Sequence, residues 1–310
     1  MACASVEWWR QAVVYQVRPP GPAERDAAGL GDVRAVISRV PYLAALGIDA
    51  VWLSSFDPSA LADDGYDDRG VHLLPGALPG RLADFDEMTS ALHAHGIKVI
   101  VDIVPDGPAF NFELLESNWD AGQFLRVIID NLDGPEQRRV PTTWVLSSHD
   151  ADGRRARAAT LLMLALPGSA LLFQGEELGL PGAANIMPGV RAQEHDPGST
   201  LNLYRQALGW RRKLQAEEIL EWMPGTNGQV LHFGRPGGWR SVTNFGPRAV
   251  PLPPGTVVAA SAPLDSTPLE RGVLPADTTA WVISVSPESE GADSRPGRVT
   301  SSGPPRNRGH

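Results

Sequence analysis

Cysteine is almost absent from this sequence, with Cys3 the single example among 310 residues. One thiol excludes an internal disulfide framework, and it cannot form a metal site without ligands of other kinds. Basic residues are also in deficit, because 27 Lys and Arg stand against 36 Asp and Glu, for a net charge of -9. No basic stripe offsets this charge, so the composition argues against binding to nucleic acid or to an anionic membrane surface.

Long hydrophobic runs are missing as well. No stretch approaches the roughly 20 apolar residues needed to cross a bilayer. The first residues, MACASVEWWRQ, lack the basic segment and the apolar segment of a secretory signal. We therefore predict a cytoplasmic protein. What the chain does contain is 42% hydrophobic residues, which suits one or two folded domains with a sizeable core.

The first hundred residues alternate strands with helices. Apolar runs predict buried strands over residues 12–17, 49–54 and 99–104. The first intervening helix is expected to be capped by Asp32, to be kinked or split at Pro41 and to end at Gly47. Asp84 and Glu87 resemble a capping box at the start of the second helix. This β-α-β-α-β order predicts a parallel sheet covered by helices.

The rest of the chain continues this pattern and then changes. Ser117 and Ser199 are expected to cap helices, with a loop from Gly179 to Pro197. Further strands are predicted over residues 143–147 and 170–174, with a helix over 154–166 between them. Short strands at 229–233, 240–244, 257–260 and 279–285, separated by Gly and Pro, predict a small antiparallel sandwich. Residues from Pro287 onward are rich in Ser, Gly, Pro and Arg, and predict a disordered tail.

One junction does not fit a continuous α/β pattern. The strand Val99–Val104 is followed by a second predicted strand, Ala109–Leu115, with only Pro105 to Pro108 between them. A parallel crossover needs about 10–12 residues or more, including its helix. Either the two strands form an antiparallel hairpin, or a segment that once lay between them is missing.

Eight motifs carry a resemblance to a known family. In chain order they are WWRQAVVYQV, YLAALGIDAVWLSSF, DDGYD, RLADFDEM, GIKVIVDIVP, TWVLSSHD, LPGSALLFQGEELGLP and DPGSTLNLYRQALGWRR. Together they resemble the α-glucosidase (oligo-1,6-glucosidase) branch of the α-amylase family, from Trp8 to about Val285. The resemblance implies a (β/α)8 barrel with a domain inserted after strand three, a C-terminal sandwich, and retaining hydrolysis of α-glucosides or oligosaccharides.

On this resemblance, Val99–Val104 corresponds to barrel strand three and Ala109–Leu115 to strand six. The expected fold is α/β: an incomplete (β/α)8 TIM-type barrel of about six βα units, with strands four and five missing, and a C-terminal antiparallel β-sandwich. The expected domains are 1–215 for the barrel-like part and 216–286 for the sandwich, followed by the tail at 287–310. A barrel closes only when strand number, tilt and shear agree, so strands three and six are expected to be edges of an open sheet.

The resemblance also implies site residues. Asp150 matches the carboxylate that stabilises the transition state, and His149 precedes it as in the family's His-Asp pair. Asp63 and Tyr66 match positions that hold the terminal glucose, and Asp102 matches the Asp of strand three. The alternatives are a helix-capping Asp beside a surface His, and a polar turn around Asp63. The Glu176-Glu177 turn matches a turn of the family that is mainly structural.

A metal site is the least supported of these expectations. The loop from Glu24 to Asp32 resembles in part the family's small metal loop, where Glu24, Asp26 and Asp32 offer oxygens for Ca or Mg. Ala28 occupies a position where the family has an Asp ligand. Three spaced carboxylates on a loop are more often solvated, so no cofactor is the simpler expectation.

The nucleophile after strand four and the acid/base Glu after strand five have no match in this chain. Glu113 and Glu116 cannot be placed at retaining geometry from sequence. A general acid contributes about 10²–10⁴ in rate and the covalent nucleophile adds to it, so we expect an α-glucosidase-like homologue that is catalytically inactive. The alternatives are a sugar-binding pseudoenzyme, a decayed product that does not fold, and residual retaining α-glucosidase activity.

Overall fold

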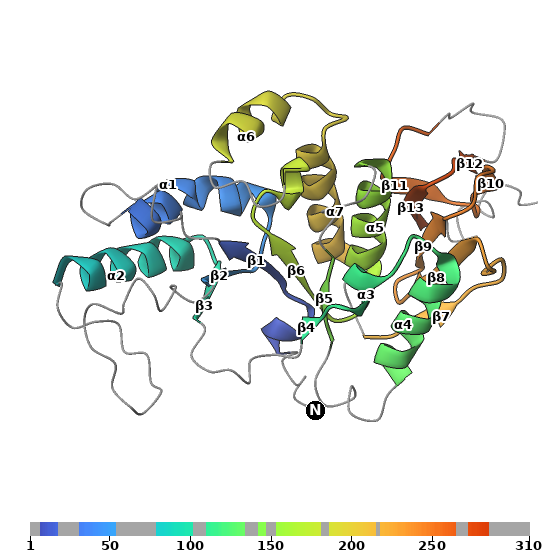
Figure 1. The fold of residues 1–310 in the computed structure, drawn as a ribbon, viewed down its shortest axis with the longest axis horizontal. Coiled ribbons are helices and arrows are strands. Elements are labelled where there is room, and N and C mark those ends of the chain that lie inside the picture. Colours follow the sequence, from blue (N-terminus) through green and yellow to red (C-terminus); the bar gives the residue numbers. More distant parts are fainter. Residues whose placement is uncertain are drawn as a thin grey trace, which may run out of the picture.

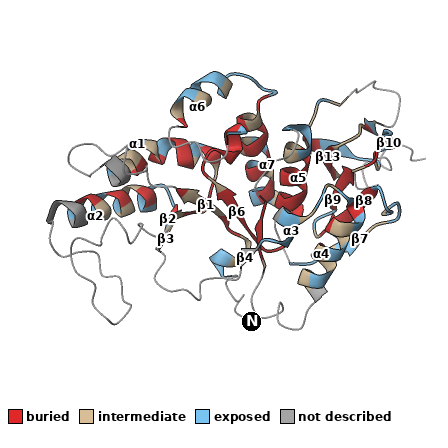
Figure 2. Cartoon of the chain, in the orientation of Figure 1, coloured by how far each residue is buried: buried red, intermediate tan, exposed pale blue. Residues whose placement is uncertain are grey.

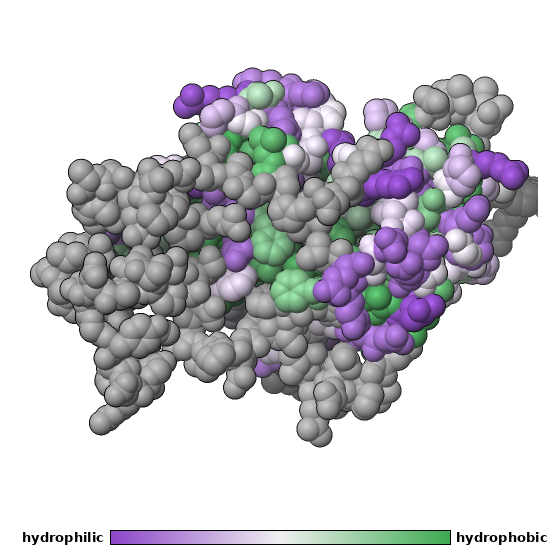
Figure 3. Space-filling view, in the orientation of Figure 1, coloured by the Kyte–Doolittle hydropathy of each residue, from purple (hydrophilic) through white to green (hydrophobic). Residues whose placement is uncertain are grey.

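The computed structural model describes residues 7–17, 31–53, 79–101, 110–133, 142–146, 153–180, 186–214, 218–264 and 272–284. An N-terminal α/β part and a C-terminal β part lie side by side (Figure 1). Hydrophilic side chains cover much of the C-terminal part on the face drawn in Figure 3, and apolar surface gathers near the middle of that view. Among the described helices, none combines the length and the apolar character that a membrane span requires.

The α/β part is built on one parallel sheet. Its strands are β1 (Val13–Val17), β2 (Ala50–Leu53), β3 (Lys98–Val101), β4 (Phe110–Asn111), β5 (Thr143–Val145) and β6 (Ser169–Phe173). They pair in the order β3-β2-β1-β6-β5-β4, with every pairing parallel. The strands β3 and β4 therefore lie at opposite edges of the sheet although they are separated in sequence by residues 102–109 alone. This is the open arrangement expected for strands three and six, and it excludes the hairpin.

Seven helices and two short 3-10 turns surround the strands in the described part of the chain. They are α1 (Gly31–Leu46), α2 (Pro79–Ala94), α3 (Glu113–Glu116), α4 (Ala121–Asp133), α5 (Gly153–Ala165), α6 (Met187–Gln193), α7 (Thr200–Leu214), η1 (Trp8–Gln11) and η5 (Glu176–Leu178). Each long helix turns its buried residues toward the sheet or toward a neighbouring helix (Figure 2). The helix α5 is buried along most of its length, from Ala158 to Ala165, because the C-terminal β-sheet and α7 pack against it.

Three expectations about the first helices are corrected by the structure. Asp32 does not cap α1, because the helix begins at Gly31 and Asp32 lies within its first turn. The helix is not split at Pro41 but continues through it; the residue is exposed, and its ring costs a hydrogen bond without ending the helix. The helix ends, as expected, where Gly47 adopts a left-handed φ of 92°. Asp84 lies inside α2 instead of capping it. Its buried carboxylate accepts hydrogen bonds from Arg34 of α1 at 3.3 and 3.4 Å.

Of the two helix caps predicted in the second half of the chain, one is confirmed and one is wrong. Ser199 caps α7 as expected, since its Oγ accepts the backbone N–H of Asn202 at 3.2 Å. Ser117 does not cap α4. The helix begins later, and Asp120 takes that role by accepting the N–H of Gln123 at 2.9 Å. The Oγ of Ser117 instead donates to the carbonyl of Glu113 at 2.7 Å.

Two segments have a different secondary structure from the one expected. The predicted strand Ala109–Leu115 is reduced to the two residues of β4, and Glu113–Glu116 form the helical turn α3. Glu and Leu are good helix formers, and the backbone of Phe112 is already helical at the start of this turn. The expected loop Gly179–Pro197 contains the helix α6, which begins with Pro188 in its first turn.

The C-terminal part is an antiparallel β structure. Its strands are β7 (Glu221–Trp222), β8 (Val230–Arg235), β9 (Trp239–Asn244), β10 (Val250–Pro251), β11 (Thr256–Ala260), β12 (Val273–Leu274) and β13 (Thr278–Ile283). Five of them form a sheet in the order β11-β13-β9-β8-β7, and β10 pairs with β12. The β10–β12 pair and the five-stranded sheet share a second small core, which includes Leu252, Leu274 and Val282. The opposite face of the sheet packs on the helices.

Hydrogen bonds fix this sheet to α5. The indole N–H of Trp281 donates to the carbonyl of Leu161 at 3.0 Å, and the hydroxyl of Thr279 donates to the carbonyl of Ala158 at 2.8 Å. Trp281 and Phe233 belong to the same hydrophobic core as the parallel sheet. The division at residues 215 and 216 stays a prediction, and the predicted tail lies outside the described residues.

Candidate functional site

The predicted site residues follow strand ends that lie at one edge of the parallel sheet. Register places Val17 beside Leu53, and Leu53 beside Val101, so the carboxyl ends of β1, β2 and β3 are aligned. Carboxyl ends of parallel strands are where α/β barrels place their ligand sites. The strand β5, which precedes His149 and Asp150 in the chain, runs in the same direction on the other side of β6.

The predicted residues themselves are not described by the structure. Those that lie outside the described residues are Glu24, Asp26, Asp63, Tyr66, Asp102, His149 and Asp150. Asp32 is in the first turn of α1, which shows its backbone position alone. In the part of the chain that is described, no three His, Cys, Asp or Glu side chains converge as a metal would require. Both the sugar contacts and the metal loop therefore stay predictions.

Two acidic residues at this edge do lie in the part of the chain that the structure describes. They are Glu176 and Glu177, in the turn that follows β6. Gly175 and Gly179 flank it with left-handed φ angles of 88° and 67°, a conformation that glycine adopts without steric cost. The tight turn directs both carboxylates into the protein. Glu176 is 2% exposed and Glu177 is fully buried.

Glu177 is held by two tyrosines from different elements. Its Oε1 accepts hydrogen bonds from the hydroxyl of Tyr42 on α1 at 2.6 Å and from the hydroxyl of Tyr15 on β1 at 2.9 Å. Its Oε2 accepts the backbone N–H of Gly175 at 3.0 Å. Burial raises the pKa of Glu177, and these hydrogen bonds oppose that rise. Burial and the nearby Glu177 charge together raise the pKa of both tyrosines, so both remain hydroxyl donors.

Glu176 is held in a second, adjoining network. Its Oε1 accepts a hydrogen bond from Tyr204 of α7 at 3.2 Å, and its Oε2 accepts the N–H of Phe173 at 3.0 Å. The hydroxyl of Tyr204 also lies 3.0 Å from that of Thr160 on α5. Burial raises the pKa of Glu176 to about 8, which favours the protonated carboxyl at neutral pH.

This arrangement fits a structural role. A nucleophile or general acid must touch the substrate, whereas each oxygen of these two carboxylates has a donor inside the protein. The two networks instead join β1, α1, β6, α5 and α7 at the carboxyl edge of the sheet. The sequence identified the turn but not its tyrosine partners. Their only local signal is a hydroxyl in an otherwise apolar strand or helix face.

The remaining acidic candidates do not form a catalytic pair either. Glu113 and Glu116 are both exposed on α3. The carboxylate of Glu113 accepts a hydrogen bond from the Asn131 side chain of α4 at 2.8 Å. Glu113 therefore helps to hold two helices together at the edge of β4.

Residues 16–124 match the family described as "Alpha amylase, catalytic domain". An "Alpha-glucosidase" of Pediococcus pentosaceus is 40% identical over 101 residues, which is 33% of this chain and 18% of that protein. A "Trehalose-6-phosphate hydrolase" of Escherichia coli (strain K12) is 36% identical over 112 residues, which is 36% of this chain and 19% of that protein. The aligned part of this chain thus spans less than a fifth of the length of these curated relatives.

Solved structures agree in fold. An α-glucosyl transfer enzyme, XgtA, superposes with a TM-score of 0.59 at 17% identity, covering 90% of this chain and 99% of that one. An isomaltulose synthase of Erwinia rhapontici NX5 gives a TM-score of 0.65 at 13% identity, again over 90% and 99%. At these identities the likeness shows the fold alone, a TIM-type α/β architecture. Together with the sequence matches, it confirms the resemblance to the α-glucosidase branch of the α-amylase family.

Proposed function

We propose that this relative of the α-glucosidase branch of the α-amylase family no longer hydrolyses glycosides, because its chain omits barrel strands four and five. The observation that carries the proposal is the position of β3 and β4 at the two edges of an open parallel sheet. In the family, strands four and five and the inserted domain lie between the corresponding strands. Here residues 102–109 alone separate them.

The order of the strands supports an internal omission. In a closed eight-stranded barrel each strand neighbours the next, and strand eight neighbours strand one. The order β3-β2-β1-β6-β5-β4 is the barrel order three-two-one-eight-seven-six, a ring opened where four and five would stand. Pairing of β1 with β6 through Val13–Ala170 and Gln16–Phe173 corresponds to the seam between strands one and eight.

The chemical consequence is the loss of two groups. Retaining hydrolysis needs a nucleophile and an acid/base carboxylate about 5–5.5 Å apart. In the family these follow strands four and five, and no matching motif occurs elsewhere in this sequence. Glu176 and Glu177, at the same edge, are buried and hydrogen-bonded, so they do not substitute. Asp150 would be left as a remnant of the transition-state stabiliser.

The direct test is an assay for hydrolysis. We expect the purified protein to release no product from an aryl α-glucoside or from maltose above the rate in buffer. Asp150→Asn separates true turnover from a contaminant, because a contaminating enzyme would be unaffected by the change. Turnover by the wild type that disappears in Asp150→Asn would refute the proposal.

A second candidate is sugar binding without catalysis. The aligned carboxyl ends of β2 and β3, at Leu53 and Val101, favour it, because Asp63, Tyr66 and Asp102 follow those ends in the chain. An α-glucoside or oligosaccharide is then the expected ligand. Titration calorimetry with glucose and maltose tests this candidate. Tyr66→Ala removes the stacking ring, and Glu116→Ala, at an exposed residue of α3, is the control. No heat at millimolar sugar contradicts it.

A further inference from the structure

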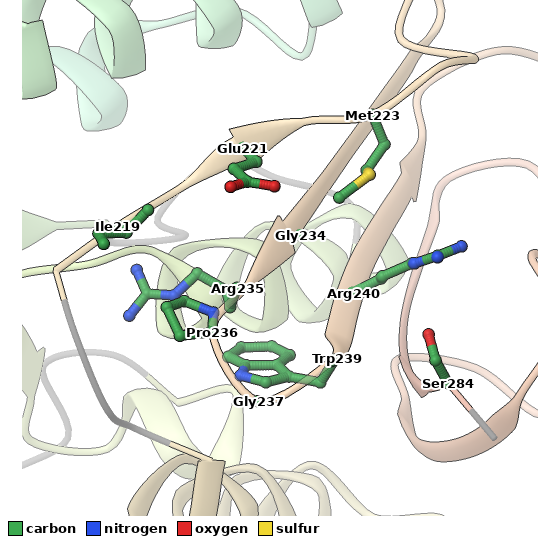
Figure 4. A pocket seen from close by; sticks show the side chains of 11 residues that line it. Ile219, Glu221, Met223, Gly234, Arg235, Pro236, Gly237, Trp239, Arg240 and Ser284 are labelled. Atoms are coloured by element: carbon green, nitrogen blue, oxygen red, sulfur yellow. The ribbon is translucent and has the colours of Figure 1, made fainter. Parts of the chain in front are cut away.

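The strand β8 has a pocket at one end and a tight turn at the other. The pocket, of about 360 Å³, lies beside the turn between β8 and β9. Figure 4 shows the Arg235 and Arg240 side chains of this pocket pointing apart, so the two charges do not converge on one ligand. The turn at the other end, residues 227–230, follows β7 and leads into β8. Its atoms are arranged for a covalent reaction.

This turn is a two-residue hairpin connection. Asn227 and Val230 exchange backbone hydrogen bonds, with N···O distances of 2.9 and 3.4 Å, and Gly228 and Gln229 form the loop between them. The backbone N–H of Phe245 donates to the carbonyl of Gln229 at 2.8 Å, which anchors the loop to the chain after β9. Asn is favoured at the first position of such a turn, because its side chain bonds to the backbone two residues further on.

Hydrogen bonds hold the side chain of Asn227 at both ends of its amide. The Oδ1 atom accepts the backbone N–H of Gln229 at 2.8 Å and that of Val230 at 3.1 Å. The Nδ2 atom donates to the carbonyl of Gly225 at 3.0 Å. Two N–H donors on one carbonyl oxygen stabilise the negative charge that develops there when a nucleophile attacks its carbon. Asn227 is also exposed, so water can reach the amide.

The neighbouring Gly228 offers the nucleophile. Its backbone N–H meets no acceptor in the part of the chain that the structure describes, and it has no side chain to hinder approach. The turn does not require a glycine here, because the φ of Gly228 is not left-handed and a Cβ would meet nothing within 4 Å. Asn227 is the single asparagine of the sequence that precedes a glycine.

We propose that Asn227 is a site of spontaneous covalent modification, at which the folded protein converts a side-chain amide into a carboxylate. The Gly228 nitrogen gives up its proton and bonds to the Cγ of Asn227. The Cγ–Nδ2 bond breaks, and the amide group leaves with one proton as ammonia. Water then opens the cyclic imide. Opening at Cγ gives aspartate, and opening at the main-chain carbonyl gives isoaspartate, with no change of oxidation state.

The two products should affect the hairpin differently. Aspartate keeps an oxygen for the N–H groups of Gln229 and Val230, and adds one negative charge to a chain whose net charge is -9. Isoaspartate inserts a methylene group into the backbone at the residue that pairs with Val230. Because Val230 belongs to the small core of the C-terminal part, we expect isoaspartate to weaken the joint between β7 and β8.

The test is incubation of the intact chain at mildly alkaline pH, where the backbone nitrogen loses its proton more readily. Peptide mapping by mass spectrometry measures replacement of the amide NH2 by OH, and chromatography separates the aspartate and isoaspartate peptides. We expect Asn227 to convert at least about 10-fold faster than Asn118, which lacks two such donors to its side chain. Asn118 is a matched reference in the same digest, since it is exposed and precedes the bulky Trp119.

Two controls separate the roles of the glycine and of the fold. Gly228→Ala has room for its methyl group and should melt like the wild type, yet convert about 10-fold more slowly, because a side chain hinders closure of the ring. The wild-type chain unfolded in urea keeps the sequence but loses both donors to Oδ1, and should convert more slowly than the folded chain. Equal rates for wild type and Gly228→Ala, or slower conversion in the folded chain than in urea, would overturn the proposal.

Discussion

The hydroxyl of Tyr42 donates a hydrogen bond of 2.6 Å to the buried carboxylate of Glu177, which joins α1 to the turn after β6. Tyr15 donates to the same oxygen from β1. One carboxylate thus connects a covering helix, the central strand and the end of the last barrel strand. This connection holds the carboxyl edge of the open sheet in place.

Removing the Tyr42 hydroxyl should weaken that connection. We expect Tyr42→Phe to lower the free energy of unfolding by about 1–3 kcal/mol, because a buried carboxylate oxygen loses one of its donors. Urea denaturation at neutral pH measures the change. Ser38→Ala, on the exposed face of the same helix, should change stability by less than about 0.5 kcal/mol. Equal effects of the two substitutions would show that the hydrogen bond is not important for stability.

Glu176 should make stability depend on pH. Its pKa is raised by burial to about 8, from an ordinary value of 4.5. Between these pH values the folded state keeps a proton on Glu176 that the unfolded state has released. The stability that this protonation contributes is therefore complete below about pH 4.5 and is lost as pH rises to about 8. The slope is at most about 1.4 kcal/mol per pH unit.

Glu176→Gln should remove this dependence, because an amide does not titrate in this range. Urea denaturation at intervals from pH 5 to pH 8 would show a flatter profile for the variant than for the wild type. Glu116→Gln, at an exposed position, is the control and should leave the profile unchanged. Parallel profiles for wild type and Glu176→Gln would contradict the assignment of the titrating group.

Substitution by alanine should change the stability of the protein in opposite directions at two of its glycines. Gly168 has a left-handed φ of 103°, and a Cβ there would clash with the carbonyl oxygen of Thr142. Gly168→Ala should therefore destabilise the protein by more than about 2 kcal/mol. Gly209 lies within α7 with open space around its Cβ position, so Gly209→Ala should stabilise by about 0.5–1 kcal/mol. Thermal melting of both variants is the measurement, and a shared sign would contradict the analysis.

Among the charged residues of α7, Arg211 should be one of those whose substitution lowers the stability of the protein most. Its guanidinium is 3% exposed and donates to the backbone carbonyls of Leu164, of Leu166 at 3.1 Å, of Gly168 at 2.6 Å and of Gln11 at 3.3 Å. It thus ties α7 to the end of α5, to the loop before β6 and to the last residue of η1.

Arg211→Met should lower the free energy of unfolding by at least about 3 kcal/mol, because several buried carbonyls lose their donor at once. Arg211→Lys should not restore stability, since an ammonium cannot reproduce the planar fork. The neighbouring Arg212→Met, at an exposed residue whose ion pair with Asp49 lies at the surface, should cost less than about 1 kcal/mol. Chemical denaturation of the three variants compares these effects, and similar losses for Arg211→Met and Arg212→Met would refute the role.

Local sequence was sufficient for much of the fold. The β-branched and apolar runs of β1, β2 and β3 predict buried parallel strands, and Gly47 and Gly96 end their helices with left-handed φ angles of 92° and 75°. The motifs on both sides of residues 102–109 were enough to predict an open sheet. In these cases local pattern and tertiary environment favour the same structure, which is when sequence is most informative.

The errors arose where distant contacts override local preference. Asp84 has the spacing of a cap, but its partner is Arg34, which another helix supplies. The hydrogen bond of Tyr204 to Glu176 spans 28 positions, and no local pattern encodes it. Asp120 caps α4 although Ser117, three residues earlier, has an equally good local signal for a cap. The candidate sugar-binding residues all follow strand ends, and the structure describes the ends but not those residues.

The indole of Trp281 has a wider implication for how the molecule unfolds. It is fully buried in a core shared by the five-stranded sheet and the helices beneath the parallel sheet. Neither half can therefore melt without uncovering apolar surface of the other. Calorimetry of the whole chain should give a single heat-absorption peak, and a fragment cut at residue 215 should be insoluble instead of a free-standing half.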